Sequence, residues 1–399
     1  MPYYRSVGEV PRKRHMQFRR PDGGLYAEEL MGEDGFSSDS ALLYHRHLPT
    51  AIVKAQAAGD GSGQGEAGGD AGLEPNRPLL PRHYATHGLE AGGDLVTGRR
   101  LLLANADVRL CYVAAERESE CYRDAVGDQC VYVEAGTGRL ESTYGALLVG
   151  EGDYVVIPTS TTHRWVVTGD APLRALVVEA SGHIRAPRRY LSATGQHLES
   201  APYSERDLRA PSEPLVVDGD ETPVLVRHRD GLTRYTYARH PFDVVGWDGC
   251  LYPYVLSIRD FEPIVKRFHA PPPVHQTFEG PRFVICSFCP RPFDFDPASV
   301  PVPYNHANVD SDEVLFYVGG DFMSRKGAGI GLGSITLHPS GFVHGPQPGS
   351  VEAAIGQAGT EELAVMLDTF APLGVGSAAR SCEDAEYAWT WARASGPGR

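Results

Sequence analysis

The fold is decided by two neighbouring stretches of sequence, NHANVDSDEVLFYVGG at residues 305–320 and GSITLHPSGFVHG at residues 333–345. Each contains a short run of β-branched and aromatic residues bounded by glycine, asparagine or proline, which is typical of a strand between turns. Two β-hairpins can bring the polar residues of these stretches together, because residues an even number apart on one strand share a face.

Two histidines and one carboxylate in these stretches have the spacing of metal ligands. His306 and Glu313 are seven residues apart, and His344 follows 31 residues after Glu313. Two neutral imidazoles and a carboxylate suit divalent iron and leave coordination positions open, although zinc and manganese are compatible with the same spacing. The pattern therefore predicts a metal centre, with Fe(2+) as the expected cofactor.

Composition and charge narrow the class of protein. The chain has 399 residues, 42% of them hydrophobic, enough for two fused domains. The net charge of −14 argues against nucleic acid as the main partner. We expect no membrane helix, since no apolar run approaches about 18 residues. The N-terminus lacks the apolar core of a secretory signal, and the seven cysteines have no regular spacing, so a cytoplasmic location is expected.

Many short strand patterns separated by turn signals predict an all-β protein with short helices. GEGDYVVIPTSTTH at 150–163 and GLGSITLHPSGFVH at 331–344 both run from glycines through a strand and a proline to a histidine, which indicates an internal repeat. We expect three parts: an N-terminal extension at 1–83 with a flexible loop at about 55–82, a first barrel at 84–240 and a second barrel at 241–399.

The first barrel lacks the full set of ligands. His163 matches His344, but no histidine pair followed by glutamate precedes it near Asp128, so we expect a structural histidine and no metal. The single pair Cys286 and Cys289 has no second pair to complete a zinc site, and is predicted to be buried thiols.

The two stretches resemble the two cupin motifs. Asn305-His306-Ala307-Asn308 with Glu313 and Gly320 is similar to the first motif, with Asn308 where a second histidine usually stands. Gly333, Pro339, Gly341 and His344 are similar to the second motif. The resemblance implies a bicupin, in which two double-stranded β-helix (jelly-roll) barrels are fused and the second carries the metal.

Further segments resemble the homogentisate 1,2-dioxygenase family in its bacterial form. They are GLYAEELMGEDGF, LYHRHLPTAI, PFDVVGWDGCLYPYVLSIRDF, RFHAPPP, VPYNHANVDSDEVLFYVGG and GSITLHPSGFVHGP, in this order along the chain. The resemblance implies an iron(II) enzyme that uses O2 to open the ring of homogentisate, giving maleylacetoacetate in tyrosine and phenylalanine catabolism. It also implies a homo-oligomer, either a hexamer or a trimer.

By position, the resemblance assigns roles to individual residues. The ligands would be His306, Glu313 and His344, and the catalytic base would be His269, with His275 as the second choice. Contacts to substrate would come from His338, Tyr304, Phe322 and His344.

Two departures from the family leave alternatives open. The spacing from His306 to Glu313 is one residue longer than in the animal enzymes, so Asp312 is an alternative ligand. Phe322 stands where the family has a substrate-contacting tyrosine, and Tyr304 or Tyr317 could supply the missing hydroxyl. The alternative functions are a related dioxygenase acting on gentisate, hydroquinone or another aromatic diol, and a non-catalytic bicupin that binds a small molecule.

Overall fold

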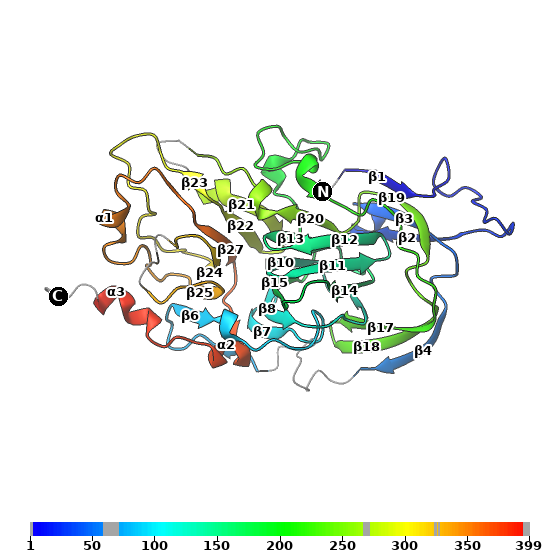
Figure 1. Cartoon of the computed structure of the whole chain (residues 1–399), viewed down its shortest axis with the longest axis horizontal. Helices are drawn as coiled ribbons and strands as arrows, with labels where there is room; N and C mark the ends of the chain where they lie inside the picture. Colours follow the sequence, from blue (N-terminus) through cyan, green and yellow to red (C-terminus); the bar gives the residue numbers. More distant parts are fainter. Residues whose placement is uncertain (1–2, 59–71, 266–271, 323–324, 326–327, 394–399) are drawn as a thin grey trace.

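The computed structural model describes residues 3–58, 72–265, 272–322, 325 and 328–393. The regular elements of the described chain are strands and a few short helices, which confirms the predicted all-β class (Figure 1). In Figure 1 the strands of the first barrel occupy the right of the molecule and those of the second barrel the left.

The first barrel is made of two sheets. The nine-stranded sheet has the order β16 (Leu208–Arg209), β20 (Tyr254–Ser257), β13 (Asp153–Ile157), β10 (Gln129–Ala135), β15 (Leu173–Ala180), β8 (Val108–Ala115), β7 (Arg100–Ala104), β28 (Gly374–Val375) and β5 (Glu74–Pro75). The seven-stranded sheet has the order β12 (Gly145–Gly150), β11 (Thr137–Ser142), β14 (His163–Val167), β9 (Cys121–Asp124), β17 (Asp220–His228), β18 (Gly231–Arg239) and β4 (Ile52–Ala57).

The second barrel is built on a six-stranded sheet. Its order is β21 (Gln276–Gly280), β22 (Phe283–Phe288), β27 (Leu363–Thr369), β24 (Asp312–Gly319), β25 (Ser334–His338) and β6 (Arg82–Ala85). A two-stranded sheet of β23 (Arg291–Pro292) and β26 (Gly359–Thr360) accompanies it.

The remaining elements are small. A four-stranded sheet has the order β1 (Arg5–Gly8), β19 (Val244–Gly249), β3 (Ser40–His45) and β2 (Ala27–Gly32). The α-helices are α1 (Ser350–Ala354), α2 (Ser377–Ser381) and α3 (Thr390–Arg393). The 3-10 helices are η1 (Asp34–Phe36), η2 (Thr86–Gly88), η3 (Arg188–Tyr190), η4 (Glu205–Asp207), η5 (Ile258–Asp260), η6 (Pro272–His275) and η8 (Tyr387–Trp389). None of the described helices is long and apolar enough to cross a membrane.

The nine-stranded sheet is buried on both faces. On β10, Val131 and Val133 pack into the interior of the first barrel, whereas Cys130 and Tyr132 belong to the core shared with the second barrel. Strands that are covered on both sides read as continuous apolar runs rather than alternating ones. The QCVYVEA sequence of β10 follows this rule.

The shared core also decides where the metal-ligand candidates point. Val314 and Phe316 of β24 pack into it. Because successive side chains of a strand alternate between faces, Glu313 and Leu315 project from the opposite face, away from the nine-stranded sheet. The sheet therefore presents Glu313 to the loops and short helices that cover its other side.

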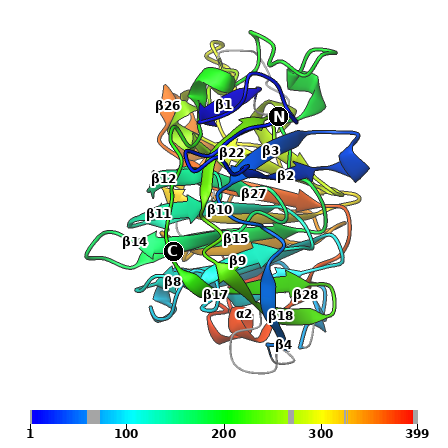
Figure 2. The same ribbon diagram turned by 90° about the vertical axis from the view of Figure 1, so that its right-hand side faces the viewer.

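Segments cross between the expected parts of the chain. β20 lies at 254–257 but pairs with β13 of the first barrel. β6, which precedes the first barrel in sequence, pairs with β25 of the second. Figure 2 shows β2 and β3 stacked above β11 and β14, and β4 at the bottom edge. Of the predicted loop at 55–82, residues 59–71 lie outside the described residues. The domain limits at 84 and 241 stay predictions.

Candidate metal centre

The three predicted ligands come from two loops and the strand between them. Glu313 is the second residue of β24, His306 lies in the loop before that strand, and His344 lies in the loop that follows β25. His306 and His344 form an isolated antiparallel bridge, with both backbone N–H···O=C distances at 2.8 Å. Directly opposed residues of such a bridge place their side chains on the same side.

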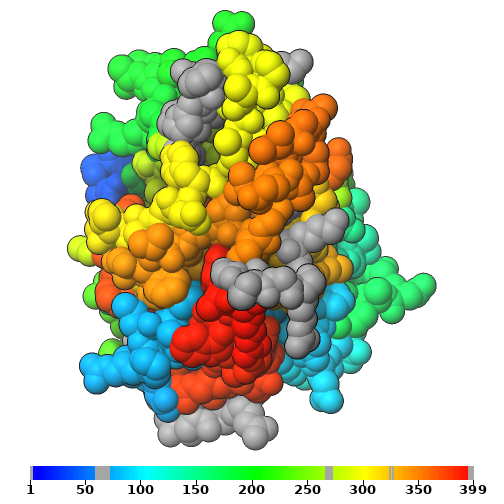
Figure 3. All heavy atoms as spheres, turned by 90° about the vertical axis from the view of Figure 1, so that its left-hand side faces the viewer, coloured from blue at the N-terminus to red at the C-terminus, as the bar shows by residue number. Residues whose placement is uncertain are grey.

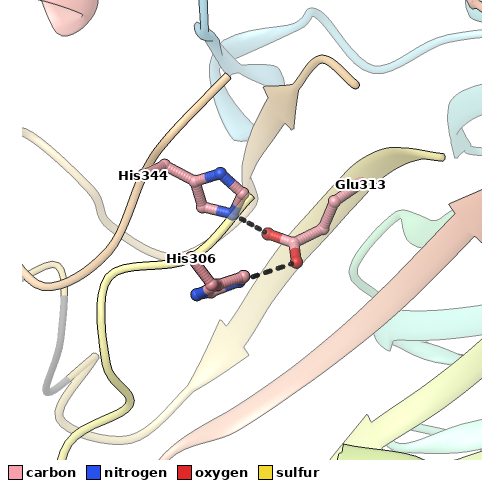
Figure 4. A group of neighbouring side chains, drawn as sticks. All are labelled: His306, Glu313 and His344. Carbon is pink, nitrogen blue, oxygen red and sulfur yellow. Dashed lines mark hydrogen bonds and ion pairs between the residues drawn. The ribbon is translucent and has the colours of Figure 1, made fainter. Parts of the chain in front are cut away.

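The structure brings the three side chains together, as Figure 4 shows. His344 Nε2 lies 3.2 Å from Glu313 Oε1, and His306 Nε2 lies 3.7 Å from Glu313 Oε2. One ligand atom from each residue falls within 4.8 Å of the other two. The side chain of His344 is completely buried, whereas that of His306 is 31% exposed, so the centre is reached from the His306 side.

The hydrogen bonds of the two histidine rings indicate which nitrogen of each ring carries the proton. Nδ1 of His306 lies 3.0 Å from the Tyr304 carbonyl oxygen, and Nδ1 of His344 lies 3.1 Å from the Phe342 carbonyl oxygen. Because a carbonyl only accepts, each ring carries its proton on Nδ1 and turns the lone pair of Nε2 toward Glu313. Two lone pairs and a carboxylate then face one another, and a cation between them satisfies all three. The donor set therefore fits a divalent metal.

Glu313 is held as an anion. Burial by itself raises its pKa, but the contacts of its two oxygens with the rings of His306, His338 and His344 outweigh burial and hold the pKa well below the usual range. His338 is the cross-strand neighbour of Glu313, and its Nδ1 lies 2.8 Å from Glu313 Oε1. The carboxylate is therefore positioned by a residue of the neighbouring strand.

Asp312, the alternative carboxylate, faces elsewhere. Its Oδ1 accepts the backbone N–H of Ser340 at 2.9 Å, and its Oδ2 accepts that of Leu373 at 2.9 Å. As the neighbour of Glu313 on β24, it projects from the other face of the sheet. These contacts favour Glu313 as the carboxylate of the centre.

A second acidic side chain beside the centre was missed by the sequence analysis. Asp368 of β27 pairs in register with Glu313. Burial and the charge of Glu313 raise the pKa of Asp368 to about 7. Asn308, which stands where cupins usually have a second histidine, donates its amide N–H to Asp368 at 3.1 Å. The only sequence signal was the aspartate in the otherwise apolar stretch ELAVMLDTF.

The other predicted site residues have different surroundings. Tyr304 is 59% exposed, and its ring centroid lies 6.2 Å from that of His306. Phe322 has a positive φ of 46°, and its ring packs edge-on against buried Tyr317 at 5.6 Å. His338 has a side chain with no exposed surface and contacts Glu313 rather than an open space.

The two candidates for the base are His269 and His275. His269 lies outside the described residues. The ring of His275 packs against that of Phe288 at a tilt of 31°, with the ring centroids 4.6 Å apart, and burial lowers its pKa to about 3. Phe288 pairs with Ala364, which is four residues along β27 from Asp368, the partner of Glu313. At about 3.3 Å per residue, the backbone of Phe288 lies roughly 13 Å along the sheet from the level of Glu313, and His275 packs against Phe288.

Another group of possible ligands is already satisfied by the protein. Glu33, Asp128 and His183 have atoms within 4.8 Å of one another. However, Glu33 accepts from Arg185 at 2.6 Å, and Asp128 accepts a backbone N–H on each oxygen, including that of Ile184 at 2.8 Å. With an arginine and two amides supplying the positive ends of these contacts, the group is a structural ion-pair cluster.

The first barrel repeats the strand pairing of the metal centre with different side chains. Gln129 of β10 pairs in register with Glu179 of β15. In the second barrel, Glu313 and Asp368 occupy the corresponding positions on β24 and β27. An amide therefore stands where the second barrel has its predicted carboxylate ligand.

His163 of the first barrel corresponds to His344 of the second. Nδ1 of His163 lies 2.9 Å from the Thr161 carbonyl oxygen, two residues back, just as Nδ1 of His344 contacts a carbonyl two residues back. His163 pairs with Tyr122 as His344 pairs with His306. The tyrosine thus takes the place of the first predicted histidine ligand.

A guanidinium lies among these first-barrel residues. Arg99, which is 4% exposed, donates to Glu179 at 2.6 Å and to Gln129 at 3.1 Å, and its charge lies 5.5 Å from the centre of the Tyr122 ring. Nε2 of His163 has no hydrogen-bond partner among the described residues. In the first barrel, Arg99 therefore places a positive charge where the second barrel would receive one from a metal.

Known proteins share this sequence pattern. The cupin domain family matches residues 109–179, which lie in the first barrel. A protein of Saccharolobus solfataricus described as a putative dioxygenase is 36% identical over 397 residues, covering 98% of this chain and 99% of that protein. The homogentisate 1,2-dioxygenase of Emericella nidulans is 26% identical, over 83% of this chain and 77% of that enzyme.

Among solved structures, protein Ylba from E. coli covers 76% of this chain and 94% of its own, with 8% identity and a TM-score of 0.34, too low to carry an argument. The full-length relative and the match to the cupin domain show the family. A dioxygenase of the cupin type works on a small molecule with O2 and requires a metal, which agrees with the donor set described above. This chain belongs to the cupin dioxygenase family.

Proposed function

We propose that this protein is an iron(II)-dependent dioxygenase that opens the aromatic ring of homogentisate and forms maleylacetoacetate. The observation that carries the proposal is the convergence of two imidazole lone pairs and one carboxylate, from His306, His344 and Glu313, in an arrangement that a cation completes. The similarity to a homogentisate dioxygenase over 83% of the chain supports the substrate. A homo-oligomer and a cytoplasmic location stay predictions.

The three ligands would hold iron through one atom each. Iron(II), when bound, would supply coordination positions for a substrate hydroxyl and for O2 and would let electrons pass between them. The protein contributes the fixed orientation of the ligands: the carbonyls of Tyr304 and Phe342 hold the two imidazole rings. Both oxygen atoms of O2 end in the product, as one ring carbon–carbon bond breaks, so the reaction needs no other oxidant.

His269 is the residue we propose as the base that takes the proton of the substrate hydroxyl. An imidazole with an ordinary pKa of about 6.5 can accept that proton near neutral pH. His275 is a weaker candidate, because burial lowers its pKa to about 3 and its ring packs against that of Phe288.

In the family, a tyrosine hydroxyl contacts the substrate. This chain has Phe322 at that position and lacks the hydroxyl. We propose that Tyr304 takes this part, because it is exposed and lies next to His306. Tyr317 is buried and lies four residues along β24 from Glu313, about 13 Å away. Phe322 is also the observation that favours the second candidate, a dioxygenase acting on a related diol such as gentisate or hydroquinone.

A panel of diols separates the two candidates. The iron-loaded protein is assayed for kcat/KM with homogentisate, gentisate and hydroquinone. We expect homogentisate to be preferred by about tenfold or more, the discrimination that loss of a few matched contacts produces. A higher kcat/KM with another diol would replace the substrate while leaving the dioxygenase in place. The Phe322→Tyr variant tests the residue directly, and it should change the ratio between substrates rather than metal binding.

A further inference from the structure

A chain of hydrogen bonds leads from the metal centre to the C-terminal part of the protein. Glu313 Oε1 contacts Nδ1 of His338 at 2.8 Å, and Nε2 of the same ring contacts the hydroxyl of Tyr387 at 2.9 Å. Tyr387 opens the short helix η8 and is completely buried. The two contacts use both nitrogens of one imidazole, so they fix its orientation completely.

The direction of each hydrogen bond in this chain follows from the groups involved. The Glu313 carboxylate can only accept, so His338 must donate from Nδ1. A neutral imidazole then has a lone pair on Nε2, and the Tyr387 hydroxyl must be the donor to it. Burial raises the pKa of Tyr387, which keeps the hydroxyl proton in place. The tyrosine thus selects the histidine tautomer that supports Glu313.

The segment that carries Tyr387 is fastened to the second barrel close to the other ligand. The indole N–H of Trp391 donates to the Gly345 carbonyl at 3.2 Å, and Arg325 donates to the same oxygen. Gly345 is the residue after His344. Gln347 donates to the Thr390 hydroxyl at 2.9 Å. The segment therefore contacts the loop of one ligand and, through His338, supports another.

The same segment is anchored to β6 on its other side. The backbone N–H of Asp384 donates to the His83 carbonyl, and that of Ala85 donates to the Cys382 carbonyl, both at 2.8 Å. Figure 3 shows this part of the chain, in red, lying between the orange surface of residues near 350 and the blue surface of residues near 80. Its position is thus set by several backbone contacts and does not depend on the Tyr387 hydroxyl alone.

We propose that Tyr387 is a positioning residue of the metal centre, which acts through His338 to hold Glu313 in the orientation that binds the metal. The proposal rests on the metal centre of His306, Glu313 and His344. It adds a role for the C-terminal segment, which reaches the site from outside the two motifs.

The test removes only the hydroxyl. In the Tyr387→Phe variant, the equilibrium affinity for Fe(2+), measured without O2, and for Co(2+) should fall about tenfold, the lower end of what loss of a residue supporting a ligand costs. The absorption bands of bound Co(2+) should shift, because they report ligand geometry. In the diol assay kcat should fall with KM nearly unchanged. Tyr203→Phe is the matched control, since Tyr203 is buried and donates to one carbonyl, that of Thr277, at 2.7 Å.

The outcomes separate this proposal from the metal centre itself. Metal affinity and Co(2+) bands equal to those of wild type in Tyr387→Phe would overturn the role of Tyr387, while a wild-type protein that binds no metal would overturn the centre. A measurement on the metal-free wild-type protein does not depend on any variant folding. With 15N-labelled histidine, NMR should show His338 protonated at Nδ1 and unprotonated at Nε2. Protonation at Nε2 would contradict the proposed direction of the chain.

Discussion

His306 and His344 exchange two backbone hydrogen bonds of 2.8 Å, although His306 precedes β24 in the sequence and His344 follows β25. This bridge places two imidazole rings 4.4 Å apart at one end of the sheet, where Glu313 meets both. The bridge explains how a short motif at 305–313 and a separate histidine at 344 come to lie together.

The ligand role of His344 is tested against its counterpart in the first barrel. His344→Ala should lose stoichiometric metal, because the remaining two ligands hold a divalent ion poorly. His163→Ala is the matched control, since both rings have the same contact between Nδ1 and a carbonyl two residues back. Metal content by elemental analysis should drop in the first variant and stay at the wild-type value in the second. Equal metal content in both would remove His344 from the ligand set.

The proposed base should affect turnover without affecting metal content. His269→Ala is expected to lower kcat by roughly 10²–10⁴-fold, the usual contribution of a general base. His275→Ala is the comparison, and it should retain most of the activity. Iron analysis on the same samples separates the two effects. Full activity in His269→Ala, or an equal loss in both variants, would show that the base has been assigned wrongly.

The buried histidine of the N-terminal sheet predicts a pH dependence of stability. His45 lies between Asp243 at 2.6 Å and Glu29 at 2.9 Å. Burial lowers its pKa, but the two carboxylates outweigh burial and raise it from 6.5 to about 9. A raised pKa in the folded state stabilises the protein fully below the unfolded value of 6.5, and this contribution is lost as the pH rises through about 9.

The size of this effect follows from the shift. It corresponds to about 3 kcal/mol of unfolding free energy. Urea unfolding of the wild type at pH 6.5 and at pH 9.5 should show most of that loss. A His45→Gln variant should be less stable at the lower pH and lose much less between the two. Parallel curves for the two proteins would contradict the role given to His45.

Removing the guanidinium from the first barrel should destabilise the fold rather than the metal centre. Arg99→Met leaves the buried carboxylate of Glu179 with one cation fewer, although Arg109 and Arg227 still contact it. We expect a loss of about 3 kcal/mol, the lower end for a broken buried ion pair. Urea unfolding of this variant is compared with Arg206→Met, whose side chain is 77% exposed. Affinity for Co(2+) at the second barrel should be unchanged in both variants.

The sequence was sufficient to predict the all-β class and the meeting of His306, Glu313 and His344. Strand periodicity and turn residues are local signals, and the three residues lie within or beside one hairpin. Tyr387 and Arg99 could not be found in this way, because each reaches its site from a distant segment. Asp368 was hidden for a different reason: it becomes a neighbour of Glu313 only through the register of β24 with β27.

The limits of the barrels were also hard to derive from local signals. β6 and β20 are short strands with ordinary sequences, and nothing in them indicates which sheet they join. Their partners, β25 and β13, are chosen by burial of the shared core. Where a strand pairs with a sheet of the other barrel, the pairing depends on tertiary contacts. The strand patterns of the sequence do not reveal these contacts.

We propose that the centre in the second barrel uses iron(II) and O2 to open the ring of homogentisate. The most direct measurement is to load the protein with iron(II) without O2, add homogentisate and then O2, and follow O2 consumption together with the ultraviolet absorption of maleylacetoacetate. We expect one O2 to be consumed per homogentisate and that product to form, with both lost in His344→Ala. Iron bound stoichiometrically without O2 consumption on homogentisate would contradict it.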